Sequence, residues 1–415
     1  MKKRLLILAV SYLFLLSKCF LNFDFVQAQD RNQNNNDVNP LYVEPATQDF
    51  SKNPKLLARI MAGPHGYFRF INIIFSKEVC RRFEETLRGT PSFNLHGDAH
   101  IEQYAITDLG RGLTDFDDSS TGPALIDLLR FGVSLHLACR AHGWGDKANE
   151  LFEKFLFGYR LGINQPDMKA EEPSLVKEIR SKFKYNRKKY LQWIDSIMEP
   201  TSQQEQKELF AAMQPYIEST IYQHPELKPE FFNIIKTGYL HMGIGSALDI
   251  KYLVRIRGKT DDFDDDVVIE IKQVRDLSGI DCITIAQKSD PFRVLVGQAR
   301  IAYQPYRYLG YIRFHDHTFW IHAWVDNYQE VEIGKSFHSV KELEEVVVDI
   351  GVQLGQGHPK QIAAPLDIQL RQEQLRILSK YEPQIKTACR ELADQTVAAW
   401  KKFCSNIVAM LRIIF

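Results

Sequence analysis

Two blocks of alternating apolar and polar residues interrupt a chain whose apolar pattern is otherwise helical. This alternation has the period of β-strands and predicts two hairpins, one from 252–257 with 267–274 and one from 308–314 with 318–325. Helical spacing dominates the segments 77–88, 124–142, 147–159, 174–198 and 373–411. A strand-rich block set among long helices predicts an α+β fold.

The N-terminal segment has the features of a secretory signal peptide. Basic residues at positions 2–4 precede an apolar run over 5–16, and Val26-Gln27-Ala28 resembles a small-residue cleavage site. We therefore expect a signal peptide over 1–28 and export to the periplasm or the cell exterior. The alternative is that the same segment stays in place as an N-terminal anchor. Beyond it we expect no transmembrane domain.

The rest of the chain is predicted to form a flexible polar spacer over 29–53 and a folded region over 54–415. The whole chain has 415 residues, and 45% of them are hydrophobic. This is enough to bury the core of one large domain or two modest ones. The folded region divides by pattern into a mainly helical part at 54–240, a strand-rich part at 241–335 and C-terminal helices at 336–415. The 52 basic residues balance the 52 acidic ones, so we expect no nucleic-acid partner.

Cysteines and histidines give weaker signals. The six cysteines, at positions 19, 80, 139, 282, 389 and 404, are scattered without a C-x-x-C pair, which predicts neither a disulfide framework nor a zinc module. One or two disulfides remain compatible with this spacing, and the sequence does not select the pairing. His315, His317 and His322 invite a metal site, but their setting favours a polar hairpin tip. We expect a structural role for His358.

The residues that point most clearly to chemistry lie within 95–130, which reads LHGDAHIEQYAITDLGRGLTDFDDSSTGPALIDLLR. Phosphoryl transfer needs a carboxylate to orient the acceptor hydroxyl and ligands to hold Mg²⁺ on the phosphates. Kinases supply these groups as an Asp, an amide five residues later, and a second Asp further on. Here Asp98 is followed by Gln103 and then by Asp115. The alternative is that these carboxylates are turn and capping residues of a structural loop.

This arrangement resembles the aminoglycoside and choline phosphotransferase branch of the protein-kinase-like fold, whose loop reads HGDxHxxN before DFD or DFE. It is more closely similar to the bacterial family called domain of unknown function 2252, which has GDAHxxNF, DFD, GPxxxDLxR and Lys-Glu-Ala segments in the same order. The resemblance implies a two-lobed kinase-like fold with ATP and Mg²⁺ as cofactors. It implies catalytic roles for His96, Asp98 and His100, and metal-binding roles for Gln103, Asp115 and Asp117.

Gln103 departs from the family pattern, because the family has Asn at this position. A Gln amide oxygen can bind Mg²⁺, but its extra methylene moves that oxygen, and Mg²⁺ demands near-ideal octahedral geometry. Asp118 and Glu102 are the other candidate ligands nearby. Gln103 therefore bears on whether the protein is catalytically active, and less on the resemblance to the family.

The expected nucleotide-binding residues follow the catalytic loop. Gly243-Ile244-Gly245-Ser246 precedes the first predicted hairpin, and Lys272 ends its second strand. Glycines let the backbone approach phosphate closely, and Lys supplies a positive charge. In ordinary kinases these elements precede the catalytic loop, so the resemblance implies a circularly permuted lobe order. A separation between Lys272 and Asp115 well beyond ~10 Å would exclude it, since both groups must meet one nucleotide–metal unit.

Three functions are compatible with this pattern. The first is a kinase-like phosphotransferase that moves a nucleotide phosphoryl group to an acceptor that the sequence does not identify. The second is a catalytically silent binding module of the same fold, working outside the cytoplasm. The third is a metal-dependent phosphoester hydrolase, because Gly-Asp-x-His also suits metal binding. For the first we expect Asp98→Ala and Asp115→Ala each to abolish turnover while leaving thermal unfolding nearly unchanged.

Overall fold

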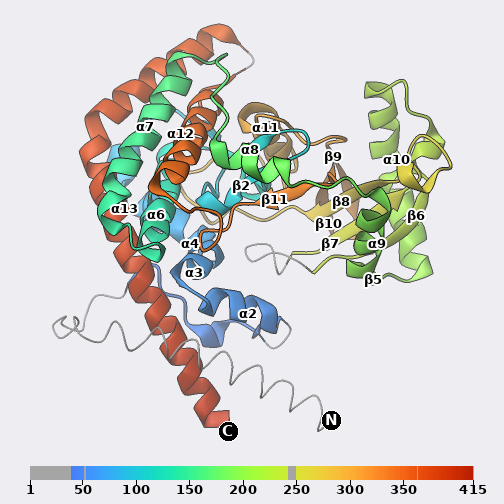
Figure 1. Ribbon diagram of the computed structural model, residues 1–415, viewed down its shortest axis with the longest axis horizontal. Coiled ribbons are helices and arrows are strands. Elements are labelled where there is room, and N and C mark those ends of the chain that lie inside the picture. The colour runs from blue at the N-terminus through green and yellow to red at the C-terminus, as the bar shows by residue number, and fades with distance from the viewer. Residues whose placement is uncertain (1–38, 51–52, 242–248, 362, 415) are drawn as a thin grey trace. The chain divides into compact units, whose positions relative to one another are not determined.

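The computed structural model describes residues 39–50, 53–241, 249–361 and 363–414 (Figure 1). The described residues form two compact units, one from within 39–75 and 391–414 and the other from within 76–241 and 249–390. The predicted signal peptide at 1–28 lies outside the described residues. The predicted phosphate-binding residues Gly243, Gly245 and Ser246 also lie outside them.

The first unit packs short N-terminal helices against the C-terminal end of a long helix. Its helices are α2 (Pro54–Met61), α3 (Pro64–Phe70), the start of α4 (Asn72–Arg82) and the end of α13 (Ala364–Ile414). Tyr67 is fully buried at its centre, with its ring centroid 5.4 Å from that of Phe403. The Tyr67 hydroxyl donates a hydrogen bond to the Leu41 carbonyl at 2.8 Å. A buried aromatic core of this kind explains why so short a group of helices is ordered.

The second unit contains an antiparallel six-stranded sheet in the order β5-β6-β7-β8-β10-β9. The strands are β5 (Glu199–Pro200), β6 (Ile234–Tyr239), β7 (Lys251–Ile256), β8 (Val267–Gln273), β9 (Gly310–Phe314) and β10 (His317–Ala323). Both predicted hairpins are therefore confirmed, as β7-β8 and β9-β10. The turn at 315–316 and the first residue of β10, His317, are exposed and form the predicted polar hairpin tip.

The two faces of this sheet have different chemistry, because side chains alternate along each strand. One face carries Tyr252, Ile271 and Phe319, which belong to a hydrophobic core shared with Leu209 and Met213 of α10. On the other face, Lys251, Lys272 and Trp320 are direct neighbours across three strands. Two neighbouring lysines are uncommon on a sheet face that is this deeply buried.

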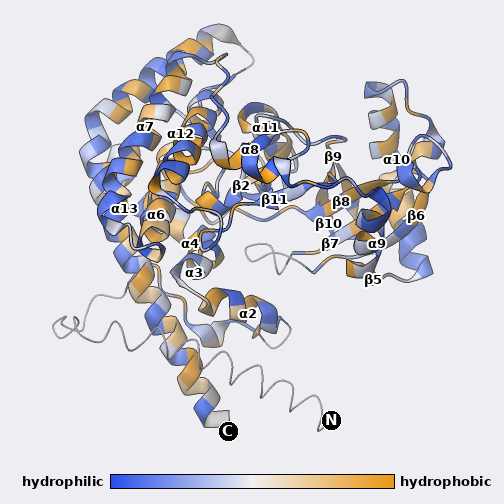
Figure 2. Cartoon of the chain, in the orientation of Figure 1, coloured by the Kyte–Doolittle hydropathy of each residue, from blue (hydrophilic) through white to orange (hydrophobic). Residues whose placement is uncertain are grey.

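Helices make up most of the second unit. They are α5 (Glu84–Leu87), α6 (Leu125–Ala141), α7 (Ala148–Asn164), α8 (Ser174–Ser181), α9 (Arg187–Ile197), α10 (Gln203–Gln223), α11 (Phe292–Ile301) and α12 (Val340–Gly357), with parts of α4 and α13. Hydrophobic and hydrophilic residues alternate along α13, as Figure 2 shows. Helices α7 and α12 approach each other so closely at Gly162 that a Cβ on this residue would lie 2.3 Å from the Val352 carbonyl oxygen. The α+β class predicted from the sequence is confirmed.

Two predicted helices are each broken in two. The segment 77–88 spans the end of α4 and the short helix α5, which a turn at Phe83 separates. The segment 174–198 forms two helices, α8 and α9, because α8 ends at Ser181 and a new helix begins after Asn186. The Asn186 side chain accepts a hydrogen bond from the Lys189 backbone N–H at 3.0 Å, which is the N-cap interaction that starts a helix. The predicted helices at 124–142 and 147–159 are confirmed as α6 and α7. Within the described ranges every helix is too short or too polar to cross a bilayer.

Two small sheets surround the sequence motif. Strand β1 (Phe93–Leu95) pairs with β4 (Ser120–Gly122), and β2 (Tyr104–Thr107) pairs with β3 (Arg111–Leu113) and β11 (Tyr328–Glu330). Short 3₁₀ turns at Ile101–Gln103 and Phe116–Asp118 lie between them. The motif residues therefore sit on tight connections between strands, where backbone geometry is closely fixed.

A disulfide joins Cys80 of α4 to Cys282, which is 202 residues away. Its reduction is expected to lower the free energy of unfolding by about 3–5 kcal/mol, because it closes a very long loop in the unfolded chain. Urea unfolding with and without reductant measures this, with free thiols counted to show that the bond has opened. The double variant Cys80→Ser/Cys282→Ser is the control and should not respond to reductant. Equal unfolding midpoints for oxidised and reduced wild type would contradict the expectation.

Candidate functional site

Asp127 fixes the position of the loop at 96–100 through hydrogen bonds to the backbone of that loop. This fully buried side chain, in the first turn of α6, accepts hydrogen bonds from the backbone N–H of His96 at 2.7 Å and of Gly97 at 2.9 Å. His358 supports Asp127, since its Nε2 lies 3.1 Å from an Asp127 carboxylate oxygen and its Nδ1 lies 2.7 Å from the Tyr159 hydroxyl. The structural role expected for His358 is therefore confirmed.

Gly97 lets the two halves of the motif meet. Its φ of +82° lies in the left-handed region, and a Cβ at this position would lie 1.9 Å from the Asp118 carbonyl oxygen. Only glycine combines that backbone conformation with so close an approach. The Gly-Asp pair in the motif thus places the carboxylate of Asp98 near the turn that carries Asp115 and Asp117.

Asp98 is buried in an ion pair with Arg130. The guanidinium Nε donates to Asp98 Oδ1 at 2.9 Å, and Nη2 lies 2.8 Å from the same oxygen. Gln103 Nε2 donates to Oδ2 at 3.3 Å, and His100 Nε2 lies 3.6 Å from it. Burial raises the pKa of Asp98, but the charges of Arg130 and then His100 outweigh it and hold the pKa well below its usual range. Asp98 is therefore an ionised hydrogen-bond acceptor and a weak proton base.

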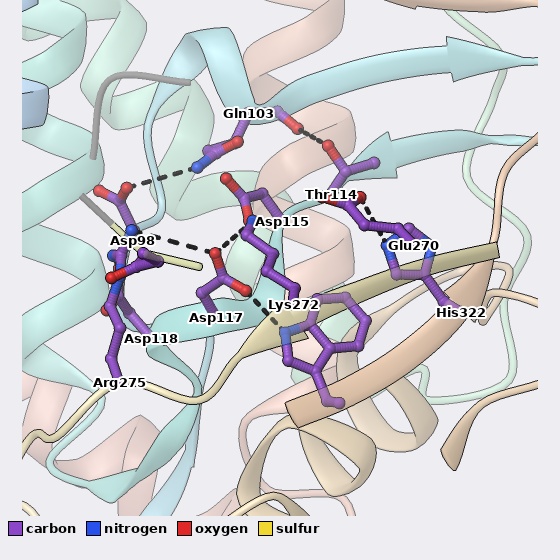
Figure 3. A network of polar contacts seen from close by, with 12 residues as sticks. Asp98, Gln103, Thr114, Asp115, Asp117, Asp118, Glu270, Lys272, Arg275 and His322 are labelled. Atoms are coloured by element: carbon purple, nitrogen blue, oxygen red, sulfur yellow. Dashed lines mark hydrogen bonds and ion pairs between the residues drawn. The ribbon is translucent and has the colours of Figure 1, made fainter. Parts of the chain in front are cut away.

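Lys272 lies between the two carboxylates of the Asp-Phe-Asp turn (Figure 3). Its Nζ donates to Asp115 Oδ1 at 2.7 Å and forms an ion pair with Asp117 Oδ2. Trp320 Nε1 donates to Asp117 Oδ1 at 2.9 Å. The proximity of Lys272 and Asp115 that the site hypothesis required is thus met.

The pKa values of the three groups in this triad, Lys272, Asp115 and Asp117, are strongly shifted. Burial and, after it, the neighbouring Asp115 charge raise the pKa of Asp117 to about 8, against the attraction of Lys272 and Arg275. For Asp115 burial acts in the same direction, but the ammonium of Lys272 outweighs it and lowers the pKa. Burial lowers the pKa of Lys272, and the two carboxylates outweigh it and raise the pKa well above its usual value. The triad therefore holds one negative and one positive charge firmly.

Asp115 is one of three non-glycine residues with a positive φ in the described part of the chain, together with Tyr308 and His315. The Asp115 φ of 58° and ψ of 67° are left-handed, which is uncommon for a residue with a side chain. Conformations of this kind cluster at functional sites, where the surrounding structure maintains them. No sequence pattern predicts this backbone conformation, although a short polar residue such as Asp tolerates it better than most.

Two further arginines contact the turn at 116–118 and the residue after it. Arg275 forms ion pairs with Asp118 and Asp249, each at 2.7 Å. Arg293 donates to the backbone carbonyls of Asp117 and Ser119. Sequence reasoning missed both arginines and the pairing of Arg130, because each contact joins segments far apart in the chain.

The remaining predicted residues have identifiable places. His96 Nε2 donates to the Thr114 carbonyl at 2.9 Å and its ring packs on Phe116, so it supports the loop. Asp118 is engaged by Arg275, and a Glu102 oxygen accepts from the Ile333 backbone N–H at 3.0 Å. Neither contact favours a metal-binding role for Asp118 or Glu102. His322 contacts Glu270 at 3.1 Å and is buried in the sheet.

The oxygen atoms of Gln103, Asp115 and Asp117 would suit Mg²⁺ if a bound ligand supplied further oxygen ligands. Gln103 is 2% exposed, and its Oε1 finds no hydrogen-bond donor among the described residues. This buried amide oxygen and the carboxylates of Asp115 and Asp117 are the hard oxygen ligands that Mg²⁺ prefers. In the described part of the chain, no group of three or more His, Cys, Asp or Glu side chains is arranged to hold a metal ion. Phosphate oxygens would complete such a site, as is usual for Mg²⁺.

Comparison with known proteins places the chain without assigning a reaction. The family model DUF2252, described as an uncharacterized protein conserved in bacteria, matches residues 53–222 and 177–406. The two matched segments together cover most of the chain, including the loop at 96–100, the turn at 115–117 and Lys272. No curated protein matches, and no solved structure matches.

Proposed function

Because the chain belongs to the DUF2252 family of uncharacterized bacterial proteins, we propose its function from the site itself. The site supports a protein-kinase-like phosphotransferase that moves a phosphoryl group from a nucleotide to an acceptor in the presence of Mg²⁺. One observation carries this proposal: Lys272 and Asp115, 157 residues apart, meet at 2.7 Å. In protein kinases a strand lysine contacts the phosphates and a turn aspartate holds Mg²⁺ on them, so both lie at one nucleotide–metal unit.

Each residue has a role in this proposal. Asp98, kept ionised by Arg130, accepts the hydrogen bond of the acceptor hydroxyl and orients it. Asp115, Asp117 and the Gln103 amide oxygen would hold Mg²⁺, which supplies positive charge against the phosphates. Lys272 would bind the phosphates, while His96 and His100 support the loop around Asp98. Positioning and electrostatics do most of the work in such a reaction, so a rigid, charged site is what the chemistry needs.

The order of these elements supports a permuted kinase-like fold. The loop with Asp98 and the turn with Asp115 come from the segment 96–117, whereas the hairpin with Lys272 follows more than a hundred residues later. We propose that the strand-rich part at 249–335 serves as the nucleotide lobe. The contact between Lys272 and the Asp-Phe-Asp turn supports this assignment.

We also propose that the protein works outside the cytoplasm. The disulfide between Cys80 and Cys282 supports this location, because such bonds persist in oxidising compartments. The signal-like segment at 1–28 points the same way. A location where ATP is scarce, together with Gln103 in place of Asn, favours the second candidate function, a silent binding module on the same fold.

Isothermal titration calorimetry with ATP and Mg²⁺ tests the proposed function. We expect the wild-type protein to bind one MgATP or MgGTP per chain and to lose that binding when EDTA removes the metal. Binding followed by slow release of ADP supports the phosphotransferase. Tight nucleotide binding contradicts the silent module, whereas no binding of either nucleotide overturns the phosphotransferase and favours the silent module.

A further inference from the structure

We propose that Lys272 is an internal counter-ion of Asp115 and Asp117, so that these two carboxylates take up Mg²⁺ only together with a phosphate ligand. This inference rests on the proposed function and deepens it. The ligand of the site is then a metal–phosphate complex, and free Mg²⁺ is excluded. Lys272 thus has a second role beside binding the phosphates, because its ammonium also controls access to the proposed metal ligands.

The Lys272 ammonium contacts oxygen atoms that the proposed metal would use. Its Nζ donates to Asp115 Oδ1 at 2.7 Å and forms an ion pair with Asp117 Oδ2 (Figure 3). The other carboxylate oxygen of Asp117, Oδ1, accepts a hydrogen bond from Trp320 Nε1 at 2.9 Å. The ammonium therefore already supplies the positive charge that these oxygens would receive from Mg²⁺, and it repels a second cation at the same oxygens.

Burial makes this repulsion strong. Lys272 is 6% exposed and Asp117 is 3% exposed, so water screens their charges little. Arg275 adds to the positive charge, since its Nη2 lies 4.0 Å from Asp117 Oδ2. Binding of free Mg²⁺ would have to separate Lys272 from its two carboxylates, and a buried charge that loses its partner is strongly destabilising. The Asp115 side chain, in contrast, is 33% exposed, so a ligand from solvent can reach the triad.

A phosphate ligand removes the competition, because it offers Lys272 new acceptor oxygens. Hydrogen bonds from an ammonium to phosphate are charge-assisted, like those to a carboxylate. Once Lys272 donates to phosphate, Asp115 and Asp117 are free to bind Mg²⁺, which phosphate oxygens help to hold. One ammonium thus couples the two binding events, and thermodynamic linkage then requires each ligand to strengthen the binding of the other by the same factor.

The test measures Mn²⁺ affinity with and without ADP, from the electron paramagnetic resonance signal of the free ion. Removing a lysine that only binds phosphate leaves the affinity for free metal unchanged, whereas removing an internal counter-ion raises it. Without nucleotide, Lys272→Met should bind Mn²⁺ at least about tenfold more tightly than wild type, a typical size for coupling between sites. Addition of ADP should raise the Mn²⁺ affinity of wild type at least about tenfold and that of Lys272→Met little. Lys259→Met, an exposed lysine between β7 and β8, is the matched control and should behave like wild type.

The outcomes separate failure of this inference from failure of the proposed function. If wild type takes up no Mn²⁺ with either ADP or GDP, the proposed function fails and the inference fails with it. If wild type takes up Mn²⁺ with ADP, but Lys272→Met without nucleotide binds it no more tightly than wild type does, only the counter-ion role is overturned. Lys272→Gln serves as a second variant if the methionine variant does not fold. Equal Mn²⁺ affinities of wild type with and without ADP overturn the inference whatever the variants do.

Discussion

Replacing Asp98 with Ala should lower the free energy of unfolding by about 3–5 kcal/mol, because it leaves the guanidinium of Arg130 buried without its carboxylate partner. Arg130 is fully buried and Asp98 is 6% exposed, so bulk water does not solvate the guanidinium that has lost its carboxylate. Urea unfolding of the folded variant measures the effect. The structure thus changes the expectation that Asp98→Ala leaves unfolding nearly unaltered.

Two controls separate the ion pair from the loss of a side chain. The double variant Asp98→Ala/Arg130→Leu removes both charges and should recover part of the stability, since apolar replacements of a buried pair are often tolerated. Glu85→Ala breaks an exposed ion pair with Arg88 and should cost less than about 1 kcal/mol. An Asp98→Ala protein that unfolds at the wild-type urea concentration would contradict the buried ion pair.

If the proposed function holds, replacing Asp115 with Asn should reduce phosphoryl transfer by more than about 100-fold, because it removes a proposed anionic ligand of the metal that would stabilise the transition state. Asn is the informative substitution here, since it tolerates the left-handed backbone of Asp115 better than Ala does. It also relieves the repulsion between Asp115 and Asp117. We therefore expect thermal unfolding to stay close to that of wild type while nucleotide turnover is lost.

The measurement is Mg²⁺-dependent formation of ADP from ATP, followed alongside the thermal unfolding midpoint. Asp264→Asn, in the exposed acidic tip between β7 and β8, is the matched control and should keep full turnover. Loss of stability in Asp115→Asn, with turnover per folded molecule unchanged, would assign Asp115 a structural role. The same result would favour the interpretation of the motif as a structural loop.

Local periodicity explains why much of the fold could be predicted. The alternating residues of β7 and β8 bury Tyr252 and Ile271 on one face, and this burial is what makes the two-residue period visible in the sequence. The helices α6 and α7 likewise follow from apolar spacing. The break at 182–186 was missed because charged and aromatic residues continue a helical pattern across it, while the N-cap at Asn186 is a single-residue signal.

The candidate site was predictable only where its residues are close in sequence. Asp98, Gln103 and Asp115 stand in one short segment, so their spacing could be compared with the needs of phosphoryl transfer. The partners that set their charges come from elsewhere: Arg130 from α6, and Arg275 from the segment that follows β8. The pairing of Cys80 with Cys282 was also beyond reach, because nothing local links two cysteines 202 residues apart.

Binding of Mn²⁺, followed by electron paramagnetic resonance, tests the central claim most directly, because Mn²⁺ favours the same oxygen ligands as Mg²⁺ and its free form gives a countable signal. With ADP present, the account predicts that wild type removes about one free Mn²⁺ per chain and that Asp115→Asn removes far less. Without ADP, wild type should take up little. Equal uptake by both proteins, or none by wild type with any nucleotide, would contradict a metal–nucleotide site at Asp115 and Lys272.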